Sequence, residues 1–374
     1  MLIYAKEKER ENDMKKMHIR WIAALLTLIL VLPLAGCGEK VQDPKTLLEG
    51  KKISVIGDSI STYDGVCNDP MVNPTLRNNT FYYRKGYFNM EIKDTWWQQT
   101  ADALGAEILV NNSWSGSCTL LPKKGIGSEA YGDRSVNLHN RDGVEPDIIA
   151  VYMGTNDFNS ASTMYGNPNQ IDYDNLVAAD GSFQKPETFC EAYALMLARM
   201  KHRYPNAEIY CMTVLERNDN KDASRMDFFN GFIKAIAEKS GAYVVNLYED
   251  SGIDATKLST SVHIADATLH PSNYGMDAIT GCLVSAILEN SAYIPDDFET
   301  CDVDYKLNNV IVTEGTTQVV PKGQPFTCSL FAGRNVQMVI EVSMDGKDIT
   351  DKCLKDGIIT IEKVTGDIKI KAEA

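Results

Sequence analysis

A serine and a histidine follow apolar segments of this 374-residue chain, at places where their side chains could act together. Ser59 stands in a Gly-Asp-Ser sequence directly after the apolar run Ile53–Ile56. A serine on a tight turn at the tip of a buried strand is placed like a nucleophile. His270 precedes Pro271, which holds the histidine backbone extended, and an imidazole accepts a proton near neutral pH. The two residue types suit base-assisted attack on an ester carbonyl.

Three further sequence blocks accompany the serine. Ile108–Val110 runs into an asparagine- and serine-rich stretch that contains Gly116. Ile148–Tyr152 runs into Gly-Thr-Asn-Asp, which contains Asn156. The last block, Asp-Ala-Thr-Leu-His-Pro, begins at Asp266 and stands just before the final predicted helix. Each block therefore falls where a buried strand is expected to end or a helix to begin.

These four blocks, in this order, resemble the SGNH (GDSL-type) hydrolase family over roughly residues 51–292. The resemblance implies an esterase that works through an acyl-enzyme and needs no cofactor. Ser59 would be the nucleophile, His270 the base and Asp266 the acid that orients the imidazole.

The resemblance also implies an oxyanion hole. Its donors would be the backbone amide of Ser59, the amide of Gly116 and the side chain of Asn156. A donor of this kind contributes on the order of 3 kcal/mol in the transition state. A glycine at position 116 lets the backbone approach the substrate closely.

The spacing of the acid departs from the family pattern. The family's acid usually lies three residues before the histidine, whereas Asp266 lies four residues before His270. The loop could absorb the extra residue, or Asp250 or Asp254 could take the role. A serine–histidine dyad that leans on a backbone carbonyl is a further alternative.

A metal site is the competing interpretation of the same segment. His263, Asp266 and His270 are potential ligands, but no second carboxylate or thiolate stands at a matching spacing. No Cys-x-x-Cys sequence occurs in the chain. We therefore expect neither a metal nor a cofactor.

The elements that must position these residues alternate between strands and helices. Short apolar runs separated by amphipathic segments predict a parallel sheet with helices on both faces, a three-layer flavodoxin-like α/β fold. Ligands of such sheets bind beyond the carboxyl ends of the strands. The predicted strands are Ile53–Ile56, Ile108–Val110, Ile148–Tyr152, Ile209–Thr213 and Tyr243–Leu247. The predicted helices are Thr95–Leu104, Phe189–Tyr204, Met226–Ser240 and Tyr274–Leu288.

The C-terminal part of the chain changes character. The hydrolase domain is expected to span 51–292 and a Pro- and Asp-rich linker 293–308. Residues 309–374 alternate in a strand-like pattern with Gly and Asp turns, which predicts a small all-β sandwich module. The predicted strands are Asn309–Thr313, Phe326–Phe331, Val336–Ser343, Ile358–Val364 and Ile368–Ala372.

The N-terminal segment is typical of an export signal. Basic residues precede an apolar run too short to span a membrane comfortably, followed by Leu-Ala-Gly-Cys, which resembles the bacterial lipobox. We expect a lipoprotein signal peptide over 1–36, lipidation of Cys37 and a linker over 37–50, with Met14 or Met17 as alternative starts. An uncleaved anchor helix is the competing interpretation. A lipid on Cys37 would hold the protein at the extracytoplasmic face of the cell membrane.

Charge and cysteine content restrict the partners. The net charge is −14, and −16 without residues 1–36, which argues against nucleic-acid binding because that needs a basic face. Eight cysteines other than Cys37 allow disulfides outside the cell, with Cys328 and Cys353 the pair to test. Scattered buried thiols are the alternative.

Three functions remain open. The first is an esterase that removes acetyl or other short acyl groups from carbohydrate. The second is a lipase or lysophospholipase, and the third is a non-catalytic glycan-binding surface lipoprotein. A long connection over 61–94 could stack on a sugar, guide an acyl chain or simply be fixed in place by its own aromatic residues. These are Tyr63, Phe81, Tyr82, Tyr83, Tyr87 and Phe88.

Overall fold

The computed structural model describes residues 43–66, 81–121, 129–159, 162–218 and 222–374. The predicted signal segment 1–36 and the predicted lipidation site Cys37 lie outside these residues. All of the described residues belong to one compact unit. No helix in the described ranges has the length and apolar character that a membrane span requires.

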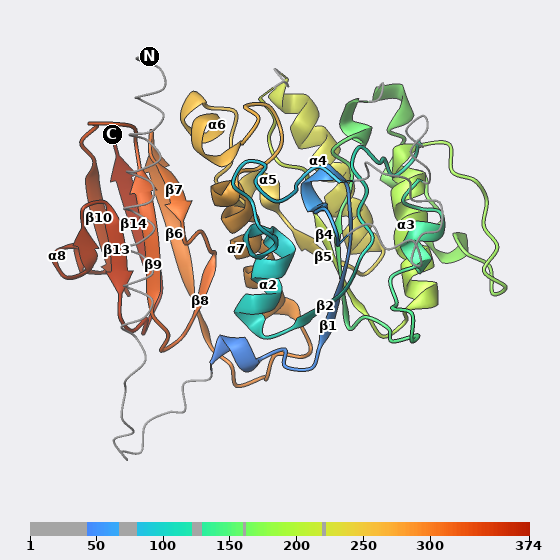
Figure 1. The fold of residues 1–374 in the computed structure, drawn as a ribbon, viewed down its shortest axis with the longest axis horizontal. Helices are drawn as coiled ribbons and strands as arrows, with labels where there is room; N and C mark the ends of the chain where they lie inside the picture. Colours follow the sequence, from blue (N-terminus) through green and yellow to red (C-terminus); the bar gives the residue numbers. More distant parts are fainter. Residues whose placement is uncertain (1–42, 67–80, 122–128, 160–161, 219–221) are drawn as a thin grey trace. The chain divides into compact units, whose positions relative to one another are not determined.

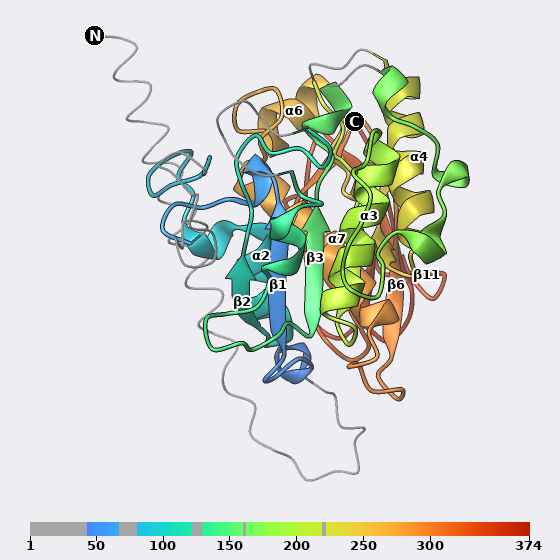
Figure 2. The same ribbon diagram turned by 90° about the vertical axis from the view of Figure 1, so that its right-hand side faces the viewer.

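A five-stranded parallel sheet carries the first part of this unit (Figures 1 and 2). Its order is β2-β1-β3-β4-β5, so β1 lies between β2 and β3. The chain therefore moves in one direction from β1 and then in the other, and ligands of such sheets bind beyond the carboxyl end of the strands where the order reverses. The strands are β1 (Lys52–Gly57), β2 (Glu107–Asn111), β3 (Ile148–Tyr152), β4 (Glu208–Met212) and β5 (Tyr243–Val245).

Helices cover both faces of this sheet (Figure 1). Successive strand residues point to opposite faces, so Val55 of β1 joins the core under α2 and α7, whereas Ile56 joins the core under α3 and α4. Trp96 and Trp97 of α2 are both buried in the first core. The helices are α2 (Trp96–Leu104), α3 (Phe189–Arg203), α4 (Ala223–Lys239) and α7 (Asn273–Asn290). The predicted three-layer flavodoxin-like fold is confirmed.

Several element boundaries differ from the prediction for local reasons. The fifth strand ends at Val245, because Leu247 already begins the short helix α5 (Leu247–Asp250). A further helix, α6 (Lys257–His263), begins after its cap Thr256. Short 3-10 helices occupy the connections: η1 (Pro44–Thr46), η2 (Ser59–Ser61), η3 (Ile92–Asp94), η4 (Asp133–Val136), η5 (Asp157–Asn159), η6 (Ser162–Met164), η7 (Pro168–Gln170) and η8 (Tyr173–Asn175).

The C-terminal part is a β module of two sheets around one core, as predicted. One sheet has the order β11-β10-β14-β6-β8 and the other β12-β13-β9-β7. Its elements are β6 (Thr300–Asn308), β7 (Ile311–Glu314), β8 (Val319–Pro321), β9 (Phe326–Phe331), β10 (Val339–Met344), β11 (Lys347–Asp348), α8 (Thr350–Cys353), β12 (Leu354–Lys355), β13 (Ile358–Ile361) and β14 (Ile368–Glu373). Cys328 and Cys353, the pair considered for a disulfide, are both free thiols.

Both segments that were predicted to be linkers contain residues that belong to the folded structure. Nine residues of the segment 293–308 form β6, which pairs in parallel with β14. The Pro and Asp residues before β6 are typical of a linker, so the alternating pattern of β6 itself was not recognised as a strand. In the segment 37–50, Leu48 is fully buried and its amide donates to Leu104 O at 2.9 Å.

Candidate active site

The turn after β1 presents Ser59. Asp58 caps η2, since its Oδ1 accepts from the Ile60 amide at 3.0 Å. At Gly57 a Cβ atom would lie 2.3 Å from Ser61 Oγ, so the turn has no room for a side chain there. The β1–η2 corner therefore requires glycine at 57 and places Ser59 at the carboxyl edge of the sheet.

The structure brings Ser59, His270 and Asp266 into one chain of hydrogen bonds. Asp266 Oδ2 lies 2.6 Å from His270 Nδ1, and His270 Nε2 lies 2.8 Å from Ser59 Oγ. An ionised carboxylate can only accept, so Nδ1 carries the proton and Nε2 is left to accept from the serine hydroxyl. The His270 and Asp266 side chains are only 14% and 22% exposed. The arrangement has the geometry of a nucleophile, a base and an orienting acid.

The loop absorbs the extra residue between the aspartate and the histidine. Ala267 takes the left-handed conformation with φ of 62°, which tightens the turn. Asp266 Oδ1 then accepts from the backbone amides of 268, 269 and 270 at 2.9–3.1 Å. Asn218 holds the turn from outside, because its Nδ2 donates to Ala267 O at 2.7 Å. The spacing of four residues is therefore compatible with an aspartate–histidine hydrogen bond.

The electrostatics of Asp266 favour its charged form. Burial alone would raise the pKa of this carboxyl group. The hydrogen bonds from the His270 side chain and from the backbone amides outweigh burial and hold the pKa well below its usual value. Asp266 therefore stays ionised wherever His270 could act as a base. The structure pairs His270 Nδ1 with Asp266 and with neither alternative acid, and Asp254 Oδ1 accepts instead from the Thr256 amide at 2.8 Å.

The residues predicted as oxyanion donors lie around the ends of β1, β2 and β3. Gly116 has a φ of 75°, a conformation that favours glycine. The Asn156 side chain donates one N–H to Ser117 O at 2.9 Å, which fixes the side-chain amide beside the glycine turn. The second N–H of the same amide remains to donate elsewhere. Within the described residues, neither the Ser59 amide nor the Gly116 amide donates to a backbone acceptor. These groups could therefore donate to a substrate oxygen.

Sequence reasoning missed Arg134, which braces these turns. It is fully buried on η4, and its Nη2 donates to Gly57 O and to Asn112 O, each at 2.7 Å. One guanidinium thus joins the carboxyl end of β1 to the segment after β2. An arginine in a polar stretch gives no sequence signal of burial, because arginine is usually exposed.

Asp157 was also missed as a structural residue of the site. This fully buried carboxylate accepts from the amides of Thr119 and Leu120 at 2.7 and 3.0 Å. Burial raises its pKa to about 6, although these two donors act in the opposite direction. Asp157 therefore anchors the segment that follows Gly116.

The three considered metal ligands do not form one cluster, because His263 is bonded elsewhere. His263 is buried and bonds through Nδ1 to Ser259 Oγ and through Nε2 to Val312 O. Among the described residues, no group of three histidine, cysteine or acidic side chains could hold a metal ion. His263 instead joins α6 to the β module.

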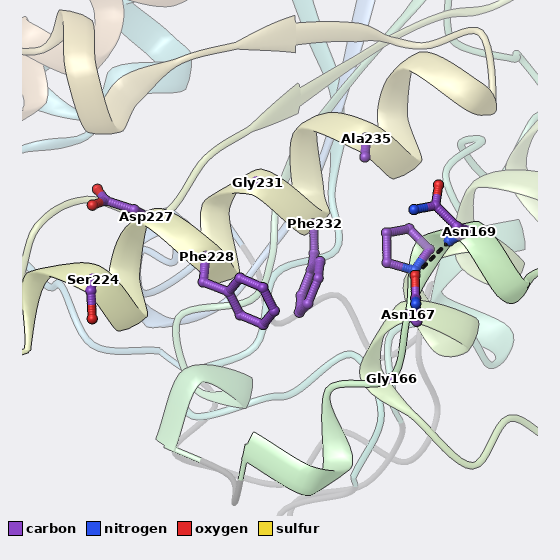
Figure 3. Close-up of a pocket in the computed structure, with 10 residues that line it drawn as sticks. Gly166, Asn167, Asn169, Ser224, Asp227, Phe228, Gly231, Phe232 and Ala235 are labelled. Atoms are coloured by element: carbon purple, nitrogen blue, oxygen red, sulfur yellow. Dashed lines mark hydrogen bonds between the residues drawn. The ribbon is translucent and has the colours of Figure 1, made fainter.

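A groove of about 680 Å³ lies along α4 (Figure 3). Phe228 is 62% exposed there and packs edge to face on Phe232. The polar groups opposite are already engaged, since Asn167 Oδ1 accepts from the Asn169 amide and Asn169 Oδ1 accepts from Lys239. None of the predicted site residues lines this groove, and we assign it no part in the chemistry.

A parallel α/β sheet with a hydrogen-bonded serine, histidine and aspartate at its carboxyl edge is the architecture of a serine hydrolase. Residues 51–287 match the model of the GDSL-like lipase/acylhydrolase family, and the chain belongs to this family. The protein is accordingly a carboxylic ester hydrolase.

Solved structures of similar proteins include lipases and esterases. A GDSL-like lipase from Bacteroides ovatus is 26% identical, covering 64% of this chain and 99% of its own, with a TM-score of 0.43. A family two carbohydrate esterase from Clostridium thermocellum, solved with cellohexaose, is 18% identical, covering 69% of each chain, with a TM-score of 0.41. An acetyl xylan esterase from Geobacillus stearothermophilus is 18% identical, covering 65% and 96%, with a TM-score of 0.38. No curated protein matches the chain.

Proposed function

We propose that this protein is an extracytoplasmic serine esterase that removes acetyl or other short acyl groups from carbohydrate. The hydrogen-bonded chain from Ser59 through His270 to Asp266 is the observation that carries the esterase role. The lipobox-like sequence before Cys37 supports a location outside the cytoplasmic membrane. An additional β module on a surface enzyme fits a polymeric substrate such as a glycan.

In the proposed mechanism, Ser59 Oγ attacks the ester carbonyl carbon while His270 Nε2 takes the hydroxyl proton. Asp266 holds the Nδ1 proton and stabilises the imidazolium that forms. His270 then gives its proton to the departing sugar oxygen, and the acyl group stays on Ser59. A water molecule attacks this acyl-enzyme with His270 as base, which releases the carboxylic acid and restores the serine.

The oxyanion is the charge that the site must stabilise. We propose the amides of Ser59 and Gly116 and the free N–H of Asn156 as its donors. Removal of one such donor typically lowers kcat by about 10²–10³-fold. Asn156→Ala would therefore lower kcat on a short ester without a comparable change in KM.

The membrane anchor is a separate part of the proposal. Cleavage before Cys37 and acylation of this cysteine would tether the enzyme to the membrane. Expression of the full chain in a bacterium with labelled palmitate is expected to give a labelled protein, and Cys37→Ser should lose the label. Equal labelling of both proteins would contradict lipidation at Cys37.

The test of the enzymatic role compares the wild type with Ser59→Ala on p-nitrophenyl acetate, p-nitrophenyl octanoate and acetylated xylan. We expect acetyl turnover that Ser59→Ala abolishes, and acetate released from xylan. A preference for the octanoyl ester would favour the lipase function instead. No turnover on any of the three substrates would favour a non-catalytic glycan-binding lipoprotein.

A further inference from the structure

Tyr82 contacts both His270 and Asp266. Its ring stacks on the imidazole, with 3.5 Å between ring centroids and 7° between planes. Its hydroxyl donates to Asp266 Oδ2 at 3.2 Å, the same oxygen that accepts from His270 Nδ1. Burial and the Asp266 carboxylate raise the pKa of Tyr82, so the hydroxyl stays protonated and can donate.

The backbone around Tyr82 is fixed to the turn of the nucleophile. The Tyr82 amide donates to Thr62 Oγ1 at 2.7 Å, and the Thr62 hydroxyl donates to Ser59 O at 2.8 Å. The next residue, Tyr83, is buried and its hydroxyl donates to Pro271 O at 2.7 Å. Residues 82 and 83 are thus bonded to the serine turn on one side and to the histidine loop on the other.

We propose that Tyr82 is a positioning residue for the catalytic histidine, an inference that rests on the proposed esterase function. The stacked ring fixes the plane of the imidazole, so that Nε2 faces Ser59 and Nδ1 faces Asp266. When His270 takes the serine proton, the imidazolium lies against the negative face of the phenol ring, which attracts a cation.

The hydroxyl of Tyr82 acts in the opposite direction to its ring. By donating to Asp266 Oδ2, it draws negative charge away from the bond that holds the imidazolium. Loss of the ring should therefore make the imidazolium less stable, whereas loss of the hydroxyl alone should make it more stable. A purely structural role for Tyr82 predicts no such opposite effects.

Other groups around His270 remain constant in this comparison. Asp266 bonds to the imidazole, the buried Asp58 interacts with it electrostatically, and the Tyr83 ring meets it edge to face at 6.4 Å. Because variants at position 82 leave these groups in place, a change in the pH profile reports on the Tyr82 ring and hydroxyl.

The experiment compares Tyr82→Phe, which keeps the ring, with Tyr82→Leu, which loses it. Tyr87→Leu is the matched control, because Tyr87 packs on Tyr82 in the same aromatic cluster and is 37% exposed. Kinetics on p-nitrophenyl acetate are measured across pH at a temperature where each variant is folded, as shown by thermal unfolding.

We expect Tyr82→Leu to lower kcat by about 10- to 30-fold with little change in KM. The acidic limb of its kcat/KM profile should move to lower pH. Tyr82→Phe should stay within about threefold of the wild type, with the acidic limb moved to higher pH. Equal kcat values for Tyr82→Leu and Tyr87→Leu, or acidic limbs that do not move, would overturn the proposal.

A second readout does not depend on turnover. In the resting protein, the proton on His270 Nδ1, which is hydrogen-bonded to Asp266, is expected to give a far-downfield signal in the proton NMR spectrum. Tyr82→Leu should broaden or remove this signal, whereas Tyr87→Leu should keep it. If the wild type hydrolyses no ester, the proposed function fails, and this signal alone decides whether Tyr82 positions the imidazole. An unchanged signal in Tyr82→Leu would refute the positioning role.

Discussion

At the scale of single residues, the two oxygens of Asp266 have separate tasks. Oδ1 accepts from three backbone amides of its own loop, whereas Oδ2 faces His270 and Tyr82. The first oxygen holds the loop, and the second selects the tautomer of the histidine. A change at Oδ2 alone should therefore affect catalysis more than folding.

Asp266→Asn tests this separation. The new amide can keep an oxygen toward the backbone donors but places an N–H against His270 Nδ1, which favours the wrong tautomer. We expect kcat to fall by about 10⁴-fold, as in triads whose acid becomes an amide. Kinetics on p-nitrophenyl acetate provide the measurement, with Asp254→Asn as control. A comparable loss in Asp254→Asn would identify the other carboxylate as the acid.

Ala267 has a backbone conformation that is unfavourable for an L side chain. Its φ of 62° belongs to the left-handed region, which costs an L-residue about 1–2 kcal/mol. Ala267→Gly should therefore raise the free energy of unfolding by about 1 kcal/mol and preserve kcat. Urea unfolding checks this prediction beside Ala292→Gly, an exposed alanine whose φ is not positive. Equal effects of the two substitutions would argue against strain at 267.

At the scale of elements, buried polar groups join the segments that follow β1, β2 and β3. Arg134 joins the turn after β1 to the segment after β2, and Asp157 anchors the segment that follows Gly116. A buried carbonyl that loses its donor costs about 1–3 kcal/mol. These buried hydrogen bonds therefore hold the predicted oxyanion donors in place, and their loss would lower the free energy of unfolding.

Arg134→Met measures the contribution of this brace. The substitution keeps an apolar stem but leaves Asn112 O without its donor, whereas Gly57 O keeps the Trp114 amide at 3.0 Å. The free energy of unfolding should therefore fall by about 1–3 kcal/mol. Turnover should fall as well, since the two turns lose their common partner. Thermal and urea unfolding are compared with Arg334→Met, which removes an exposed arginine. If both variants unfold alike, the brace contributes nothing.

At the scale of the whole described unit, α6 and α7 are bonded to the β module. His263 bonds to Val312 O, and the Asp277 carboxylate accepts from the Gly315 amide at 2.9 Å. A Cβ atom at Gly281 of α7 would lie 1.7 Å from Thr316 O, so the helix and the module backbone are in direct contact. The module and the hydrolase part are therefore expected to unfold together.

Gly281→Ala tests the close contact between α7 and the module. The added methyl group meets backbone, which cannot rotate away, so we expect a loss of about 1–3 kcal/mol or more in the free energy of unfolding. Gly231→Ala on α4 is the matched control, because a Cβ there meets nothing within 4 Å. That change should stabilise the helix by about 0.5–1 kcal/mol. Effects of the same sign would contradict the contact.

Asp277 makes this contact dependent on pH. Burial is the main cause that raises its pKa to about 6, against an unfolded value of about 3.9. The folded state therefore holds the proton more tightly, and the stability from this group is full below about pH 4 and lost as pH rises through about 6. Unfolding free energies measured from pH 4 to 8 should show this fall in the wild type. Asp277→Asn should lack this component of the fall, and equal slopes would contradict the assignment.

The α/β fold could be predicted because each of its elements has a local cause. Strands buried on both faces need continuous apolar runs, and the helices between them need caps and apolar faces. The same logic failed at β6, whose half-exposed alternation follows a Pro- and Asp-rich stretch, and at the short helix α5. Such elements are decided by the neighbours that they pair with or pack on.

The sequence by itself determined the parallel sheet, the family of the chain and the candidates Ser59, His270 and Asp266, because these depend on residue type and order along the chain. Only the tertiary structure decided that Asp266 reaches His270 despite its spacing. It also decided that Arg134 is buried between two turns and that Tyr82 covers the imidazole. These contacts join segments distant in sequence, so no local pattern of residues encodes them.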